Sequence, residues 1–350
     1  MFSFMKKDLV GIDIGSSSVK LVQLKESKEG YLLLKVGMTP LPPEAIVDNT
    51  LMDPSAVVAA VRSLIGTCGV KVTQAACSIS GNSVIIRKIG FPVMTADELE
   101  DQIHWEAEQY IPFDINDVNI DFHILGPDEY DPAKMNVLLV ASKKDIVNDY
   151  VTLFNEAGIK LTVLDVDSFA VQNAFEANYD PAPDEVVALV NIGSTIMNLN
   201  IIRGGESLFT RDVQLGGNLY TEEIQKKLGF KEEEAEKLKL SAQVTANEAV
   251  MGVILQVNET LAMELYRSMD FYNANAGEDK IIKIYGSGGC CKIPFLLDAI
   301  HNRLNLPVEV IDPFQKIIWS DKQFVPEQLK DLGPHVTVAL GLAMRRYADK

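Results

Sequence analysis

The chain has 350 residues, of which 47% are hydrophobic and 23% are charged, and its net charge is −17 at pH 7. This length predicts roughly two domains. The acidic balance argues against nucleic acid as a partner, because phosphate backbones are bound by clustered Lys and Arg.

No apolar run reaches the ~18 residues needed to span a bilayer. The four cysteines and four histidines form no zinc or disulfide pattern. The apolar and then basic start, residues 1–7, is too short for a signal peptide, and its contact with lipid or a partner stays open.

The first ninety residues predict the start of a sheet. Leu9–Leu24 reads as two strands around a Gly-Ser turn, which is a hairpin signal. A third strand follows at Tyr31–Met38, and Asp53–Ile65 is predicted to be a helix with an Asp cap and a Pro in its first turn. Two more strands are expected at Gln74–Ile79 and Val84–Ile89.

The character of the chain changes at Phe91. A capping signature at Thr95 predicts a helix to about Tyr110. Strands are expected at Ile120–Leu125 and Met135–Ser142, and a helix at Asp145–Ala157 that ends at a glycine. We therefore interpret residues 91–160 as an inserted α+β subdomain.

The hairpin motif occurs a second time. Val187–Ile202 repeats the pattern of the first hairpin, with Asn191 in the place of Asp13, 178 residues earlier. A repeat at half the chain length implies two similar domains. The Asp- and Pro-rich segment 180–184, which follows a helix expected at Ser168–Ala177, marks the boundary between them.

The second half is predicted to be helical around one more strand. Helices are expected at Tyr220–Leu228, Lys231–Leu240, Ala249–Asn273, Ile293–Leu304 and Thr337–Tyr347, and a strand at Lys280–Tyr285.

Two Gly-Ser turns facing each other across a cleft would form a phosphate-binding site. Backbone N–H groups of tight turns bind phosphate oxygens, and glycine lets the backbone approach closely. Lys20 could reach a phosphate as a point charge, and Asp13 would hold Mg²⁺ through water. One such turn alone is weak evidence, since many hairpins have one, but two are hard to explain by packing. The residues expected at the phosphates are Gly15, Ser16, Ser17, Gly193, Ser194 and Thr195.

A third glycine motif stands between the strand at Lys280–Tyr285 and the next helix. Gly286, Ser287 and Gly288 suit close contact with a nucleoside, although a plain strand-to-helix turn explains this segment equally well when it is taken alone.

Five motifs in order resemble the actin-like ATPase superfamily: residues 11–16, 164–170, 190–195, 285–290 and 339–343. The resemblance implies an α/β, duplicated actin-like (ribonuclease-H-like) two-domain fold that binds ATP and Mg²⁺. It makes Asp13 the Mg²⁺-associated acid and Lys20 the phosphate lysine. Asp167 falls where the superfamily has a polar or acidic residue that helps to place the attacking water.

The resemblance also places Glu236 and Lys239 beside the adenosine, although a solvated charged helix fits these residues too. Asn191 departs from the usual Asp of the second phosphate loop. An amide can hydrogen-bond a metal-bound water but cannot act as a general base. We therefore expect a slow ATPase at most, or a nucleotide-gated switch.

The insertion before the second domain resembles that of FtsA of cell division and of the PilM family of type IV pilus assembly proteins. Phe91-Pro92, the segment Trp105–Phe113 and an end at Lys350 directly after the last helix favour the PilM family. Its members hold the cytoplasmic N-terminus of PilN in a groove beside the insertion, by burying apolar side chains. Ile103, Trp105, Tyr110 and Phe113 could line this groove, although an apolar helix face is more often core.

The family implies a cytoplasmic protein at the inner face of the cytoplasmic membrane, peripheral through its partners, with other pilus inner-membrane components as further partners. Self-association stays open. Two alternatives share the fold, a filament-forming cell-division protein like FtsA and a sugar-kinase-type phosphotransferase, and fold alone does not choose among them. The expected division is 1–90, 161–183 and 335–350 for the first domain, 91–160 for an FtsA-type inserted subdomain, and 184–334 for the second domain, with a helical subdomain at about 218–277.

Overall fold

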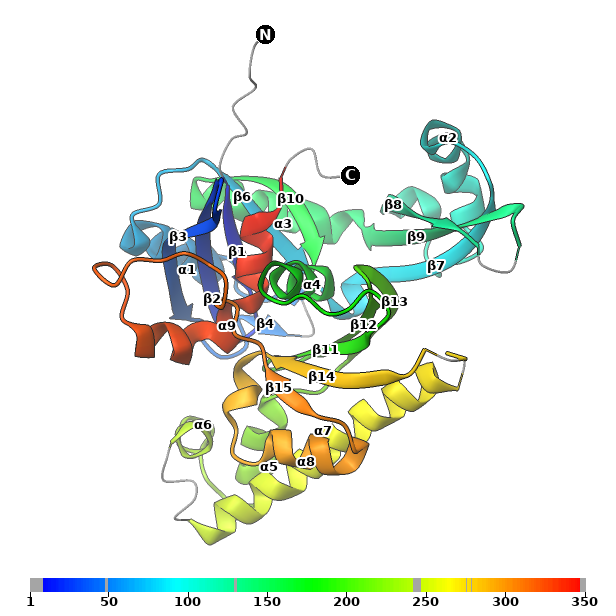
Figure 1. The fold of residues 1–350 in the computed structure, drawn as a ribbon. Helices are drawn as coiled ribbons and strands as arrows, with labels where there is room; N and C mark the ends of the chain where they lie inside the picture. Colours follow the sequence, from blue (N-terminus) through cyan, green and yellow to red (C-terminus); the bar gives the residue numbers. More distant parts are fainter. Residues whose placement is uncertain are drawn as a thin grey trace.

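The structure, a computed structural model, describes residues 9–47, 50–128, 131–241, 247–274, 276–277 and 279–346. The apolar-basic start at residues 1–7 and the end of the chain at Lys350 lie outside the described residues. None of the helices within these ranges combines the length and the apolar character that crossing a membrane requires. Two five-stranded sheets and one three-stranded sheet form the framework (Figure 1).

The first five-stranded sheet has the order β10-β6-β1-β2-β3. The predicted hairpin is confirmed, because β1 and β2 pair antiparallel around the Gly-Ser turn. β6 and β10 then add in parallel on the other side of β1. The sequence did not predict β10. The bounds are β1 Val10–Ile14, β2 Ser18–Ser27, β3 Gly30–Pro40, β6 Gln74–Ile79 and β10 Lys160–Val166.

The second five-stranded sheet repeats the first. Its order is β13-β12-β11-β14-β15, with three antiparallel strands followed by two parallel ones. The duplication expected from the repeated hairpin is therefore confirmed at the level of the whole sheet. The sequence missed β13, which is polar, and β15, which has only three residues. The bounds are β11 Val186–Ile192, β12 Met197–Arg203, β13 Glu206–Val213, β14 Ile281–Ser287 and β15 Val308–Val310.

Helices α1 (Pro54–Cys68) and α3 (Lys144–Ala157) cover one face of the first sheet. α1 begins at the predicted cap, where the Asp53 carboxylate accepts a hydrogen bond from the Ala56 N–H, and ends at a left-handed glycine. Tyr150 and Phe154 of α3 lie in the same core cluster as Val57 and Val61 of α1. α3 therefore packs with the first sheet, although the sequence placed it in the insertion.

The inserted subdomain is a three-stranded sheet, β7-β9-β8, covered by helix α2. The predicted capping box of α2 is complete, since the Thr95 and Glu98 side chains each bond the other's backbone. The helix ends three residues before the expected Tyr110. β7 pairs with β9 from Val84 onward, seven residues before the expected start of the insertion at 91. We propose 84–143 as its bounds. The elements are β7 Val84–Pro92, α2 Ala96–Ala107, β8 Val118–Pro127 and β9 Lys134–Lys143.

Helices α5, α7 and α8 pack with the second sheet in one core cluster, to which α6 adds Ala235. All four were predicted, to within three residues at their starts. The bounds are α5 Asn218–Leu228, α6 Glu232–Leu240, α7 Glu248–Asn273 and α8 Leu296–Leu304. The remaining short elements are β4 Ile46–Val47, β5 Thr50–Leu51 and the 3₁₀ turns η1 Gly81–Ser83, η2 Ile115–Asp117 and η4 Gly289–Lys292.

Two helices, α4 (Asp167–Asn178) and α9 (Pro326–Met344), lie between the two large sheets (Figure 1). α9 starts eleven residues before the predicted Thr337. The interior Pro334 hid this start, because proline usually ends a helix pattern. One core cluster joins the two helices to both sheets and contains Leu9, Ala76, Ala170, Phe175, Val187, Leu189, Val338 and Leu342.

The two helices cross with their backbones in contact. A Cβ atom built on Gly341 of α9 would lie 1.7 Å from the carbonyl oxygen of Ala170 in α4. A Cβ on Gly11 of β1 would lie 2.1 Å from the carbonyl oxygen of Ala339. Only glycine fits at both points, so α9 is held against α4 and the first sheet at a fixed distance.

This crossing gives a first prediction. Gly341→Ala should lower the free energy of unfolding by about 3 kcal/mol, because overpacking forces backbones apart. The matched control is Gly252→Ala in α7, where a Cβ would meet nothing within 4 Å. The free energy of unfolding of that variant should rise by up to about 1 kcal/mol, because alanine has a higher helix propensity than glycine. Urea unfolding followed by circular dichroism measures both, and equal effects of the two substitutions would contradict the close crossing.

Candidate functional site

The two Gly-Ser turns have the same geometry and meet tip to tip. The Gly15 N–H donates to the Ser18 carbonyl at 3.1 Å, and the Gly193 N–H donates to the Ile196 carbonyl at 2.9 Å. The Ser16 hydroxyl lies 2.6 Å from the Ser194 hydroxyl and 2.9 Å from that of Thr195. The repeated turns of the two domains thus lie side by side. Each glycine N–H is engaged within its turn, whereas the hydroxyls of Ser16, Ser194 and Thr195 are placed where a ligand could contact them.

A buried ion pair stands at the base of the first turn. Asp13 and Lys20 are cross-strand neighbours on β1 and β2, and the Lys20 Nζ lies 3.2 Å from a carboxylate oxygen of Asp13. A Cβ on Gly15 would lie 2.6 Å from that Nζ, so the glycine lets the lysine lie over the turn. Ser17, at the tip, is exposed, and its carbonyl accepts from the Leu41 N–H at 2.9 Å.

A second carboxylate, Asp167, stands at the start of α4. The Ser78 hydroxyl donates to its Oδ1 at 2.6 Å. Burial, and then the negative charge of Asp13, raise the pKa of Asp167 from 3.8 to about 6. Two carboxylates are therefore close enough to repel each other.

This pair fits the demands of Mg²⁺, which binds proteins through one or two carboxylates and keeps most of its waters. A divalent cation would relieve the repulsion between Asp13 and Asp167. Throughout the described ranges, no group of three or more His, Cys, Asp or Glu side chains is arranged to hold a metal ion. A cation here would therefore depend on few protein ligands.

The base of the second turn is held by an amide network. The Asn191 Nδ2 donates to the Asn198 Oδ1 at 3.0 Å, and the Ser287 hydroxyl donates to the Asn191 Oδ1 at 3.2 Å. The Asn198 Nδ2 donates in turn to the Asp212 Oδ1 at 2.8 Å. Ser287 is fully buried, so its hydroxyl positions Asn191. The sequence had suggested Ser287 as a ligand residue and had not indicated Asn198 or Asp212.

The third glycine motif lies beside the second turn. Gly286 is opposite Val190 in the sheet. Gly288 has φ +87°, and a Cβ there would lie 2.4 Å from the Ile192 carbonyl oxygen, so only glycine fits. Its N–H donates to the Pro334 carbonyl of α9 at 2.8 Å, which joins the loop to the central helix.

His335, which follows Pro334 on α9, packs against Gly289. Its Cε1 would lie 2.9 Å from a Cβ on that glycine. Burial, and then the positive charges of Lys292 and Lys20, lower the pKa of His335 to about 4. The imidazole is therefore neutral at pH 7 and lies near Lys20. No local sequence signal marks it.

Glu236 and Lys239 of α6 lie beside the second turn. Lys239 is 5% exposed, and its Nζ donates to the Gly217 carbonyl at 3.2 Å, to Thr221 at 3.1 Å and to the Glu236 carboxylate at 2.5 Å. The Gly217 N–H donates to the Gly193 carbonyl at 2.9 Å. A fully solvated charged helix is thus wrong for Lys239, while contact of this pair with adenosine stays a prediction.

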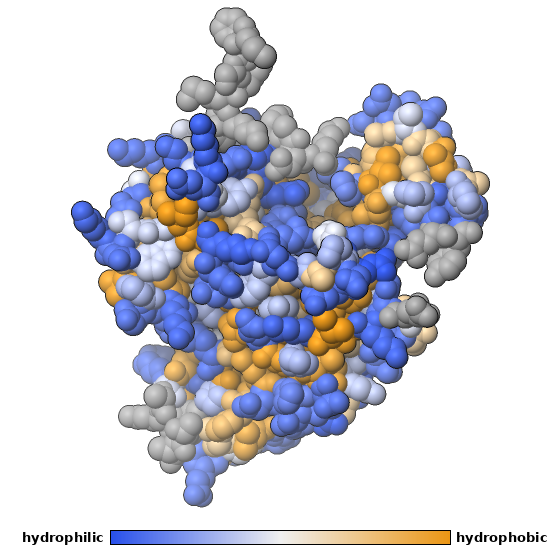
Figure 2. Space-filling model, in the orientation of Figure 1, coloured by the Kyte–Doolittle hydropathy of each residue, from blue (hydrophilic) through white to orange (hydrophobic). Residues whose placement is uncertain are grey.

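The aromatic segment of the insertion is divided between core and surface. Ile103 is 2% exposed and belongs to the core of the subdomain. Phe113 packs against that core, and the Lys143 Nζ lies 4.3 Å from its ring centroid. Trp105 is 79% exposed and Tyr110 40%. Figure 2 shows hydrophobic surface on the inserted subdomain, at the upper right, bordered by hydrophilic atoms.

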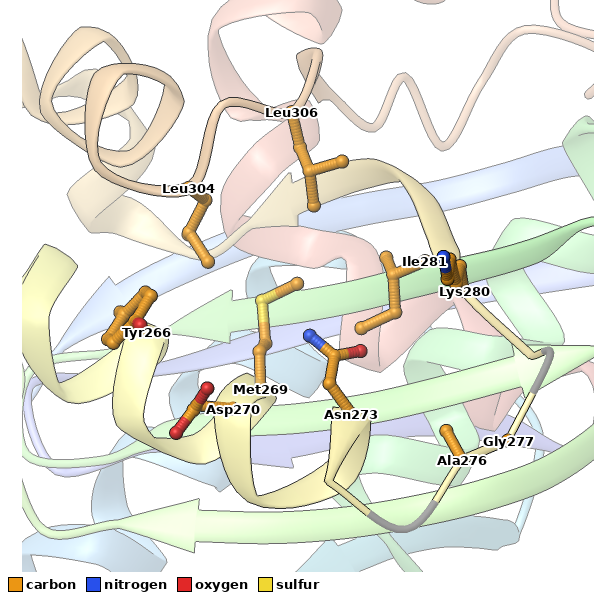
Figure 3. Close-up of a pocket in the computed structure, with 10 residues that line it drawn as sticks. All are labelled: Tyr266, Met269, Asp270, Asn273, Ala276, Gly277, Lys280, Ile281, Leu304 and Leu306. Carbon is orange, nitrogen blue, oxygen red and sulfur yellow. The ribbon is translucent and has the colours of Figure 1, made fainter.

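A separate pocket of about 340 Å³ opens in the second domain (Figure 3). It is lined by the end of α7, including Tyr266 and Met269, by the start of β14, by Leu304 at the end of α8 and by Leu306 after that helix. It shares no residue with the two turns, so it is not the site built around them.

Comparisons with known proteins agree with this architecture. The family described as type IV pilus assembly protein PilM matches residues 11–347. The solved PilM-PilN type IV pilus biogenesis complex contains a chain that is 28% identical, with a TM-score of 0.89 over 99% of this chain and 100% of that one. Ethanolamine utilization protein EutJ from Carboxydothermus hydrogenoformans has the same fold, with 15% identity and a TM-score of 0.60 over 96% of this chain and 89% of that one. The expected fold class is confirmed.

The cell division protein FtsA of Bacillus subtilis (strain 168) is 24% identical over 253 residues. The match covers 66% of this chain and 57% of that protein, so the chain spans little more than half the length of this relative.

The raised pKa of Asp167 gives a pH-dependent prediction. A native pKa of about 6 against an ordinary 3.8 means that the folded state binds the proton more tightly, so ionisation costs native stability as pH rises from about 4 to 6. Near pH 4, Asp167→Asn should therefore have nearly the same thermal midpoint as the wild type. As the pH rises, its midpoint should exceed that of the wild type by a growing amount, which reaches a plateau above pH 6. Thermal unfolding from pH 4 to pH 8 measures this. Asp184→Asn, at an exposed position, is the control. An increase in thermal midpoint for Asp167→Asn that does not depend on pH would refute the raised pKa of Asp167.

Proposed function

The chain belongs to the family of the type IV pilus assembly protein PilM, and from this premise we propose that it is a nucleotide-dependent scaffold of the pilus assembly machinery. ATP with Mg²⁺ binds between the two Gly-Ser turns. The state of the cleft then controls binding of the cytoplasmic N-terminus of PilN.

The observation that carries the proposal is the contact of Ser16 with Ser194 and Thr195 at 2.6 and 2.9 Å. These hydroxyls come from opposite domains and bond each other where the two turns meet. A triphosphate between the turns would exchange these hydrogen bonds for bonds to its oxygens, so that ligand and domain closure are linked. Lys20 lies at the same place to offset phosphate charge.

Asp13, and Asn191 through water, would hold Mg²⁺, which when bound neutralises charge on the phosphates. Asp167 is a candidate to orient or deprotonate a water, because its raised pKa suits proton transfer near neutral pH. Asn191 is an amide and adds no general base. We therefore propose slow hydrolysis at most, and a role that depends mainly on binding.

The nucleoside would lie along Gly286 and Gly288 on one side and Glu236 and Lys239 on the other. Gly288 supports this, since its backbone approaches the second turn without a side chain in between. The buried Lys239 supports the second turn through Gly217. The Glu236 side chain, which is 42% exposed, is the group of this pair that could reach a ribose hydroxyl.

The solved relative is a PilM-PilN complex, and we propose that this chain binds the PilN N-terminus on its inserted subdomain. Trp105 and Tyr110 are the apolar side chains that α2 and the residues after it leave exposed. Aromatic residues of this kind dominate binding energy at interfaces. The protein would be held at the inner face of the cytoplasmic membrane through this partner. Binding to other pilus inner-membrane components and self-association are further proposals.

Nucleotide binding is tested by calorimetry with ATP, with and without Mg²⁺. Loss of a charged partner of the phosphates or metal, in Asp13→Ala or Lys20→Ala, should weaken ATP affinity about 10- to 100-fold. Asp321→Ala, which removes an exposed acid, is the control and should bind like the wild type. Equal and magnesium-independent affinity in all four proteins would rule out this site.

Partner binding is tested with a peptide of the PilN N-terminus in a fluorescence anisotropy titration. Trp105→Ala should lower its affinity about tenfold or more, as expected for an aromatic anchor. Since Trp105 is 79% exposed, the thermal midpoint should hardly move. Tyr266→Ala, which removes an exposed aromatic residue at the separate pocket, is the matched control. If Tyr266→Ala lowered the affinity for the peptide and Trp105→Ala did not, the partner site would have to be assigned to the second domain.

A further inference from the structure

We propose that Asp212 is a positioning residue that ties the second phosphate turn to the root of the inserted subdomain, so that cleft closure sets the orientation of this subdomain. The inference rests on the proposed function, because it supplies the physical link between nucleotide and partner. The link consists of Asn191, Asn198, Asp212 and Gly81.

The first part of the link is a ladder of side chains across three adjacent strands. Asn191 is directly opposite Asn198 in the pairing of β11 with β12, and Asn198 is directly opposite Asp212 in the pairing of β12 with β13. Side chains at opposite positions share one face of a sheet. Hydrogen bonds of 3.0 and 2.8 Å join them. The sheet register therefore fixes Asp212 relative to the second turn.

The second part crosses to the first domain. The Gly81 N–H donates to the Oδ2 of Asp212 at 2.5 Å. Gly81 begins η1, the turn between β6 of the first sheet and β7 of the insertion. Asp212 thus uses one carboxylate oxygen for the second phosphate turn and the other for the point where the chain enters the insertion.

The root of the insertion is held from both sides of the cleft. Three residues before Gly81, the Ser78 hydroxyl donates to Asp167 at 2.6 Å, within the first domain. Further along, the Lys88 Nζ of β7 lies 2.7 Å from the Glu206 carboxylate of β13. β13 therefore contacts Gly81, just before the insertion, through Asp212, and the insertion itself at Lys88 through Glu206. Figure 1 shows β13 beside the start of β7.

The two contacts of β13 with the insertion differ in strength. The side chains of Lys88 and Glu206 are 35% and 31% exposed, and an ion pair this accessible contributes about 0–1 kcal/mol. A hydrogen bond from a backbone N–H to a carboxylate is charge-assisted and roughly twice as strong as a neutral one. Asp212 is also connected to Asn191 through Asn198. If the second domain moves away from the first, both contacts separate, while Ser78 stays with Asp167. The bond of Asp212 to Gly81 is therefore the contact that depends on the position of the second Gly-Ser turn.

The experiment measures coupling rather than affinity. The dissociation constant of the PilN N-terminal peptide is determined with and without saturating ATP and Mg²⁺, and the ratio is the coupling factor. Asp212→Ala should bring a wild-type factor of about ten close to one. Asp212→Asn should do the same, because an amide cannot accept at both positions. Lys88→Ala, which removes the exposed ion pair, is the control and should change the factor less than twofold. A merely structural role of Asp212 would lower stability and leave the factor unchanged.

A second measurement does not need the peptide. Spin labels on the exposed Gln102 of α2 and Asn302 of α8 report the distance between the insertion and the second domain. ATP with Mg²⁺ should narrow the wild-type distribution and leave that of Asp212→Asn broad. Loss of nucleotide binding in the wild type would defeat the proposed function itself. Two outcomes would overturn the present inference alone. One is that the Asp212 variants keep the wild-type coupling factor or the narrowing of the distances. The other is that a wild type that binds ATP shows neither coupling nor narrowing.

Discussion

The close contact of the Gly341 backbone with the Ala170 carbonyl, at which a Cβ would lie 1.7 Å away, sets how closely the two central helices cross. α4 and α9 stand between the two duplicated sheets and share one core with both. Their distance therefore sets the distance between the domains. α4 begins with Asp167, and α9 contributes the Pro334 carbonyl that accepts from Gly288. Asp167 at the start of α4 and Pro334 in the interior of α9 both lie at the candidate site. A change in the crossing of the two helices would therefore move Asp167 and the Gly288 loop together, and the site depends on a contact that none of its own residues makes.

On the proposed function, a chain with a net charge of −17 at pH 7 would have to bind a polyanion, and the charges at the site bear on how it could do so. Asp13 and Asp167 place two carboxylates where phosphates would come, and burial opposes the ionisation of the second. Lys20 is near, but it is paired with Asp13. His335 contributes no charge at pH 7, because burial and two lysines lower its pKa to about 4. On the proposed function, the favourable charge would therefore come largely from a metal ion that accompanies the nucleotide, and we expect nucleotide binding to depend on magnesium for this reason.

Local patterns predicted the parts of the fold that are themselves local. The paired Gly-Ser hairpins, the Asp53 and Thr95 caps and the glycine after α3 each depend on neighbouring residues, and all are confirmed. β13 and the first half of α9 were missed, because a polar strand and a helix with an interior proline are stabilised by tertiary packing. The site shows the same division. Ser16 and Lys20 could be found from a motif, whereas Asp212 acquires its partners only when three strands and a distant turn come together.

The departure at Asn191 connects these observations. In the ladder the hydrogen bonds run in one direction, with Asn191 donating to Asn198, Asn198 donating to Asp212, and the Asp212 carboxylate ending the series as an acceptor. An aspartate at position 191 has no hydrogen to donate when ionised. Asn198 would then have to turn its amide toward position 191 and present an oxygen to Asp212, which would set two acceptors against each other. Asn191 therefore cannot act as a general base, but its amide connects the second turn, through Asn198 and Asp212, to the root of the insertion. On the proposed function, this chemistry suits a switch better than a hydrolase.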